Sequence, residues 1–224
     1  MSVTTFSEQL FEELCTRKHV AIRRIPVDES KTPDYEVRLG PVKVLVEVKQ
    51  LDENSEDQAL NAALCRGEPL PPILSQVKRV RKQIADGYVQ LKAGARAQVP
   101  TILVLYNNAG LLRSIDSFTV TRAMFGEYGV KFGLPRDVRA DIQVLRQGFM
   151  GHRKLTRNTC CGLSVVAVLK DARWGSLRLD AYHNPFAEVA LGPSKLAYLA
   201  IEQYMHPNPH DGLLVDWEPV KITN

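Results

Sequence analysis

Three charged residues in the first quarter of the chain have the types and spacing to hold a divalent cation. Asp34 begins one alternating polar and apolar segment, and Glu47 and Lys49 lie in the next. Two residues apart on a strand, Glu47 and Lys49 share a face and stand about 6.6 Å apart along the chain. If the segments pair as a hairpin, Asp34 meets Glu47 across the strands. Two carboxylates beside one lysine are costly without a cation between them, so we expect Asp34 and Glu47 to bind Mg²⁺.

A cation in this position would lower the pKa of a bound water and stabilise negative charge on phosphoryl oxygens. Lys49 would orient the attacking water or neutralise the developing charge. Glu13, on the shoulder of the apolar stripe of the first predicted helix, is expected to hold a second metal or an outer water. The alternative is a solvated face with a weak surface ion pair between Glu47 and Lys49.

Hydrophobic periodicity predicts the elements that position these residues. We expect an α/β fold in one domain over residues 1–224, with core motifs in 5–107 and a C-terminal elaboration in 108–224. A hairpin turns at Gly40–Pro41, and Pro71–Pro72 opens a long helix that ends near Gly94. The remaining predictions are helices over 5–18, within 51–68 (capped by Ser55), over 117–125 and over 194–204, and strands over 19–27, 34–39, 42–51, 101–106, 161–169 and 177–182.

This order of elements and motifs resembles the PD-(D/E)xK nuclease superfamily, which has the restriction-endonuclease-like fold. The matching residues are Glu13, Pro33–Asp34 and Glu47–Val48–Lys49, and the resemblance covers about the first 107 residues. It implies a mixed central sheet of four or five strands flanked by helices. It also implies that Asp34, Glu47 and the Val48 carbonyl bind Mg²⁺, with Mn²⁺ able to substitute, and that Lys49 assists phosphodiester hydrolysis.

Members of this superfamily often carry a functional glutamine on the second core helix. Gln83 and Gln90, seven residues apart along one edge of the long predicted helix, are the candidates. The alternative is that both are exposed helix-edge residues.

The charge distribution favours a polyanionic partner. The 224 residues carry a net charge of +4, but residues 1–68 hold 13 Asp+Glu and 9 Lys+Arg, whereas residues 69–224 hold 12 and 20. Residues 142–170 contain no acid. Within that run, Arg153, Lys154 and Arg157 lie in a polar segment that we expect to contact nucleic-acid phosphates, although a merely solvated loop is the alternative.

Other motifs are missing from the sequence, and their absence excludes several functions. The four cysteines form no CxxC pair, and no apolar run approaches the roughly 20 residues of a membrane helix, so we expect reduced thiols, a cytoplasmic location and no membrane partner. Phosphate-binding glycine loops and the GxSxG and HExxH motifs do not occur. His183 follows a predicted strand and is expected to be structural.

The sequence therefore predicts a divalent-metal-dependent nuclease that cuts DNA in preference to RNA. Dimerisation would suit an enzyme that cuts both strands. The alternatives are a catalytically inactive nucleic-acid-binding module on the same fold and an interaction subunit of a defence or mobile-element system.

Overall fold

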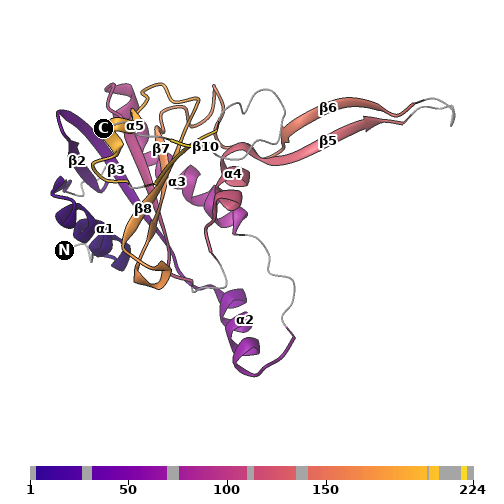
Figure 1. The fold of residues 1–224 in the computed structure, drawn as a ribbon, viewed down its shortest axis with the longest axis horizontal. Coiled ribbons are helices and arrows are strands. Elements are labelled where there is room, and N and C mark those ends of the chain that lie inside the picture. The colour runs from indigo at the N-terminus through magenta and orange to yellow at the C-terminus, as the bar shows by residue number, and fades with distance from the viewer. Residues whose placement is uncertain are drawn as a thin grey trace.

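The computed structural model of the protein describes residues 4–26, 32–69, 76–109, 114–134, 141–200, 202–206 and 218–220. These residues form a mixed α/β fold, as predicted (Figure 1). In chain order the elements are α1 (Phe6–Arg17), β1 (Ala21–Arg24), β2 (Tyr35–Leu39), β3 (Val42–Leu51), α2 (Ser55–Cys65), α3 (Val77–Arg96), β4 (Thr101–Asn107), α4 (Ser117–Phe125), β5 (Glu127–Gly133), β6 (Gln143–Met150), β7 (Val165–Lys170), η2 (Ala172–Trp174), β8 (Arg178–His183), α5 (Pro193–Leu196), β9 (Glu202–Met205) and β10 (Glu218–Pro219).

One mixed sheet organises the described part of the chain. Its strand order is β1-β2-β3-β4-β7-β8-β9-β10. Strands β3, β4 and β7 run parallel to one another, whereas β2–β3 and β7–β8 are antiparallel pairs. Eight strands exceed the expected four or five. The excess arises because strands of the C-terminal half, β7 to β10, extend the same sheet.

The two strands at the centre of the sheet have the predicted patterns of burial. In β3, Val44, Val46 and Val48 face the core cluster that includes α1, whereas Leu45 and Leu51 pack with α3 on the opposite face. Glu47 and Lys49 share the face of Leu45 and Leu51 by their spacing. All seven residues of β4 are buried, as expected for a strand covered on both sides.

Helices cover both faces of this sheet. Helix α1 packs on one face, and α3 and α4 pack on the other (Figure 1). Helix α3 lies close to β3 and β4 because Gly87 and Gly94 have no side chains at the contact. A Cβ atom at Gly87 would lie 2.5 Å from Leu103 Cδ1, and one at Gly94 would lie 2.7 Å from Leu45 Cδ1. Within the described ranges, no helix has the length and apolar character that a membrane span requires.

The predicted β2–β3 hairpin is confirmed, and its register determines where Asp34 lies. Leu39 pairs with Val42 across the Gly40–Pro41 turn, and Gly40 has a φ of +61°. Because Tyr35 pairs with Val46, Asp34 lies opposite Glu47 at the start of β2.

Several boundaries differ from the prediction. Helix α2 is capped by Asn54, whose side chain accepts a hydrogen bond from Asp57 N, rather than by Ser55. Strand β1 is shorter than the expected 19–27 because His19, with a φ of +53°, still belongs to the turn after α1. The expected start of the long helix at Pro71–Pro72 lies outside the described residues, and the helix extends past Gly94 to Arg96.

The predicted helix over 194–204 is confirmed at its start and wrong at its end. Among the described residues of this segment, Pro193–Leu196 is helical, whereas Glu202–Met205 forms β9, which pairs parallel with β8. The apolar spacing of this segment fits a helix, but β8 offers an edge of backbone donors and acceptors that a strand satisfies. The Gln203 side chain further ties β9 to His183 of β8 at 2.9 Å.

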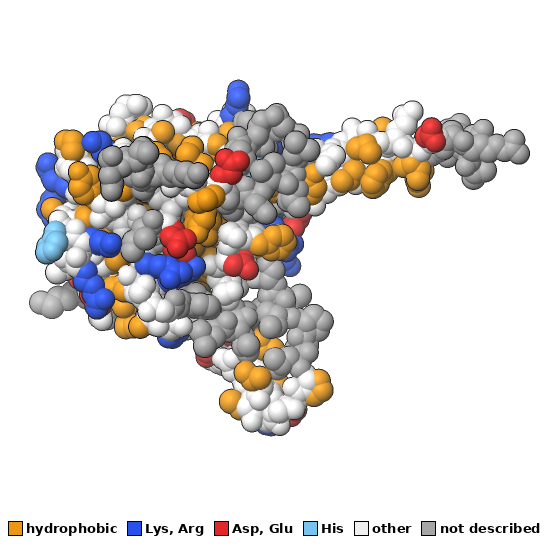
Figure 2. Space-filling model, in the orientation of Figure 1, with side chains coloured by type: hydrophobic (Ala, Val, Ile, Leu, Met, Phe, Trp, Pro, Cys, Tyr) orange, Lys and Arg blue, Asp and Glu red, His pale blue; other side chains and the backbone are white. Residues whose placement is uncertain are grey.

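A two-stranded arm formed by β5 and β6 was not predicted. It projects from the body of the molecule, and apolar side chains gather along it (Figures 1 and 2). Val130, Phe132, Val144 and Leu145 are exposed there. Strands are usually recognised in a sequence by apolar residues that alternate with polar ones, because one face of the sheet is buried. The arm has apolar side chains that are exposed, so its sequence does not show this pattern.

Candidate active site

Asp34 and Glu47 meet at the open end of the β2–β3 hairpin. The Asp34 Oδ2 atom accepts a hydrogen bond of 2.8 Å from the backbone N–H of Val48, which fixes its carboxylate against β3. The two carboxyl groups are close enough to hydrogen-bond when one of them is protonated. The structure therefore brings together the two predicted metal ligands.

Glu47 is a completely buried carboxylate. Its exposed fraction is 0%. Among the described residues it forms an ion pair with Lys49, whose Nζ atom lies 2.5 Å from Oε1, and its other close polar neighbour is the Asp34 carboxyl group. Burial, and after it the negative charge of Asp34, raise the pKa of Glu47 to about 7 against the opposing effect of Lys49. The pKa of Asp34 is also raised, first by burial, against the opposing effect of its hydrogen bond from Val48.

Gln90 connects Lys49 to the segment that leads into β2. Its Oε1 atom accepts a hydrogen bond of 2.8 Å from Lys49 Nζ, and its Nε2 atom donates to the Thr32 carbonyl at 3.3 Å. Helix α3 thus positions the lysine head and the chain two residues before Asp34. Gln83 makes no such bond, and it precedes Gln90 by two helical turns, or about 10 Å along the axis.

Helix α1 contributes Glu8 rather than Glu13 to the neighbourhood of Asp34. Glu8 is 9% exposed, its Oε2 atom accepts a hydrogen bond from Thr5 N at 2.7 Å, and its charge helps to raise the pKa of Asp34. Glu13 is directed elsewhere: its side chain is 45% exposed, pairs with Arg17 and lines a surface groove beside Arg173.

Glu13 was predicted from its angle around the helix axis, but that angle does not show which turn along the helix approaches the site. The first turn does, because Ser7 N donates a hydrogen bond of 2.9 Å to Gln50 Oε1, next to Lys49 in β3. The spacing Thr5-x-x-Glu8 is the signal that could have found Glu8. A capping box folds the glutamate back over the start of its helix.

The donor set at this site suits a hard divalent cation. No group of three or more His, Cys, Asp or Glu residues that could hold a metal occurs in the described part of the chain. Two carboxylates suffice for Mg²⁺, which keeps several waters and binds through one or two protein carboxylates. The buried Glu47 carboxylate lies beside Asp34 with Lys49 as its cationic partner, so a divalent cation would offset the negative charge that the two carboxylates share. The Val48 carbonyl, the third ligand implied by the resemblance, belongs to the residue whose N–H holds Asp34.

Two of the three predicted phosphate-contacting residues lie together. Arg153 and Lys154 line a groove against α3, whereas Arg157 is exposed in the following turn, which a bridge between Thr156 and Thr159 closes. The structure thus separates Arg157 from the other two.

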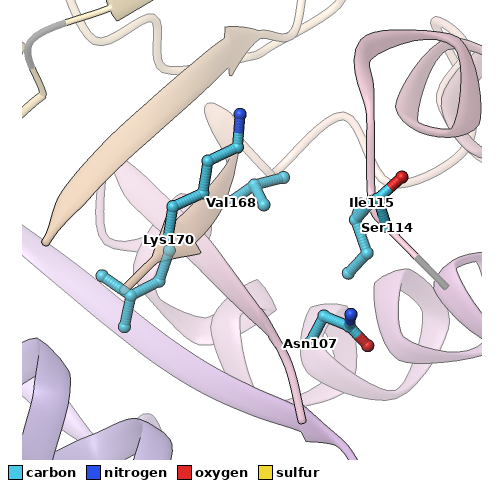
Figure 3. Close-up of a pocket in the computed structure, with 6 residues that line it drawn as sticks. Asn107, Ser114, Ile115, Val168 and Lys170 are labelled. Atoms are coloured by element: carbon cyan, nitrogen blue, oxygen red, sulfur yellow. The ribbon is translucent and has the colours of Figure 1, made fainter. Parts of the chain in front are cut away.

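A small cavity and a buried histidine elsewhere offer no second catalytic centre. The cavity at the carboxyl ends of β4 and β7 has a volume of about 20 Å³, enough for roughly one water. Figure 3 shows Asn107, Ser114, Ile115, Val168 and Lys170 around it. Lys170 is paired with Asp180. His183 is buried and bonded to Gln203, and burial lowers its pKa, in agreement with a structural role.

Comparison with known proteins does not identify a function for this site. No family model matches the chain, and no solved structure matches it. A serine–tRNA ligase of Pseudomonas entomophila (strain L48) is 27% identical over 103 residues, which are 46% of this chain and 24% of that protein. The chain therefore spans about a quarter of the length of this relative, and the match does not show a family.

The raised pKa of Glu47 predicts how stability depends on pH in the presence of a chelator. Between pH 4.5 and about 7 the folded protein binds a proton that the unfolded chain has released, so stability falls as pH rises through this window. Glu47→Gln should flatten this decline and, near pH 8, raise the free energy of unfolding by about 3 kcal/mol. Thermal melts across this pH range measure the effect.

Glu13→Gln is the matched control, because Glu13 is a half-exposed carboxylate on α1. It should leave the pH profile of the wild type unchanged. If the wild type and Glu47→Gln lose stability in parallel as the pH rises, the raised pKa of Glu47 is contradicted.

Proposed function

We propose that this protein is a divalent-metal-dependent nuclease with a restriction-endonuclease-like core, which hydrolyses DNA in preference to RNA. The observation that carries the proposal is the meeting of Asp34 with the buried Glu47 beside Lys49. The order α1, β2–β3, α3 and β4 around this site supports it, because the resemblance implies the same order. A cytoplasmic location and dimerisation accompany the proposal as expectations.

Asp34 and Glu47 would hold Mg²⁺ or Mn²⁺, together with the Val48 carbonyl. The bound cation supplies positive charge that activates water and stabilises the phosphoryl oxygens. The carboxylates of Asp34 and Glu47 confine it to one end of the hairpin, since β3 fixes both side chains. Hydrolysis adds a water oxygen to phosphorus and breaks the bond to the leaving oxygen, which takes up a proton.

Lys49 is the residue placed to meet the substrate. Its side chain is 24% exposed, whereas that of Glu47 is fully buried, so Lys49 is the more accessible member of this ion pair. There it can donate a hydrogen bond to a phosphoryl oxygen or to the attacking water. Gln90 keeps the lysine head at that position through its 2.8 Å hydrogen bond and is a positioning residue.

Substitution of the three charged residues tests the proposal. With Mg²⁺ or Mn²⁺, the wild type should cleave plasmid DNA, single-stranded DNA or RNA, and gel assays should rank DNA first. Asp34→Asn, Glu47→Gln and Lys49→Met should each lower the rate by about 100-fold or more, because each removes a charge at the reacting centre. Glu13→Gln should retain the wild-type rate.

Cleavage that survives both Glu47→Gln and Lys49→Met would discard this site. If folded wild type cleaves none of the substrates, the enzyme proposal fails, and a nucleic-acid-binding module or an interaction subunit takes its place. Melting curves of each variant show that it is folded.

The two glutamines of α3 should behave differently. Gln90→Ala frees the Lys49 head and should lower kcat by about tenfold with little change in KM, because it disturbs positioning rather than binding. Gln83→Ala, two turns away on the same edge, should change kcat by less than about twofold. Gln90→Glu keeps an acceptor for Lys49 and should restore most of the rate. Equal effects of the two alanine substitutions would contradict the role of Gln90.

A further inference from the structure

A groove with cationic walls lies on a different side of α3 from Gln90. Its helical wall consists of Lys78, Arg81, Lys82 and Ala85. On a helical wheel these positions lie roughly 80° to 180° around the axis from Gln90, away from the carboxylate site. The opposite wall is the loop of His152, Arg153 and Lys154.

Three of the five lysines and arginines that line the groove form no ion pair with a carboxylate of the described residues. Among the described residues no carboxylate forms an ion pair with Lys78, Arg153 or Lys154, whereas Arg81 pairs with Glu127 and Lys82 pairs with Asp86. The Nε atoms of Arg153 and Arg81 are buried without a hydrogen-bond partner in the described part of the chain. Buried guanidinium donors left in this state are costly until an acceptor arrives.

The arm brings a further cation near Arg153. Arg146 of β6 is near enough that its charge, after burial, contributes to lowering the pKa of Arg153. Lys131 is the cross-strand partner of Arg146, so both side chains leave the same face of the ribbon. Repulsion between like charges destabilises the free protein and favours an anion that binds between them.

The loop wall is held in a fixed conformation. Lys154 N and Leu155 N both donate to the Met124 carbonyl, at 3.0 and 2.9 Å, and Leu155 is fully buried. Gly126, with a φ of +96°, packs so closely that a Cβ atom there would lie 2.3 Å from the Gly151 carbonyl oxygen. The cations are therefore presented by an ordered backbone, which reduces the entropic cost of binding.

We propose that this groove binds the sugar–phosphate backbone of a nucleic acid. The inference rests on the proposed function for its choice of polyanion. The groove offers cations and no acid on its walls, so it holds phosphates without reading bases. Ala85 is the smallest side chain among the residues that line the groove, so it leaves space between the cations of the two walls.

A charge placed on Ala85 tests the groove without removing any of its cations. Ala85→Glu puts a carboxylate among the phosphate-binding groups, and Ala85→Gln is its uncharged match in shape and helix propensity. Both changes are made in the Glu47→Gln background. Fluorescence anisotropy then measures the binding of short duplex DNAs of two unrelated sequences, in EDTA and over a range of salt concentrations.

Ala85→Glu should weaken binding by about tenfold or more relative to Ala85→Gln, equally for both sequences, and should lower the salt slope by about 1. Ala93→Glu, on an exposed position of the same helix, should bind within about twofold of its background protein. Equal affinity of Ala85→Glu and Ala85→Gln, or no measurable binding by the background protein, would overturn the inference. Cleavage by the wild type is measured separately, so failure of the groove leaves the nuclease proposal to its own test.

Discussion

The structure depends on one unfavourable contact, two carboxyl groups held together in a buried position. Asp34 and Glu47 both have raised pKa values, chiefly because burial penalises their ionised forms. The hairpin register places the two carboxyl groups together. The hydrogen bond from Val48 N–H to Asp34 and the ion pair of Glu47 with Lys49 offset part of the free-energy cost of this contact. A site of this kind gains stability when a cation binds, since the cation replaces the repulsion with attraction to both groups. This is the physical basis for regarding the pair as functional rather than structural.

Helix α3 links this site to the cationic groove. Its glycines at positions 87 and 94 let it lie directly against the sheet, which brings Gln90 within hydrogen-bonding distance of Lys49. Another side of the same helix carries the helical wall of the groove. A rigid helix that presents both features fixes their separation. In this account a backbone held in the groove and a phosphate beside Lys49 occupy a constant relative position, which loops alone would not ensure.

The sequence predicted the β2–β3 hairpin well because local rules determine it. Strict alternation around Gly40–Pro41 specifies both the strands and their register, and the register alone places Asp34 opposite Glu47. The contribution of α1 could not be predicted in the same way, because choosing between Glu8 and Glu13 requires knowing which helical turn docks on β3. The helix prediction for 194–204 failed at its C-terminal end for a related reason. The apolar spacing there fits a helix, but Glu202–Met205 pairs with the edge of β8 instead.

The central claim is that Asp34 and Glu47 form a binding site for a divalent cation, and calorimetric titration with Mn²⁺ tests it most directly. The account predicts saturable binding to the wild type and to Glu13→Gln, and at least about a tenfold weaker affinity for Asp34→Asn and for Glu47→Gln. The measurement does not depend on any substrate or on turnover. Absence of saturable binding to folded wild type, or equal binding by all four proteins, would contradict the account.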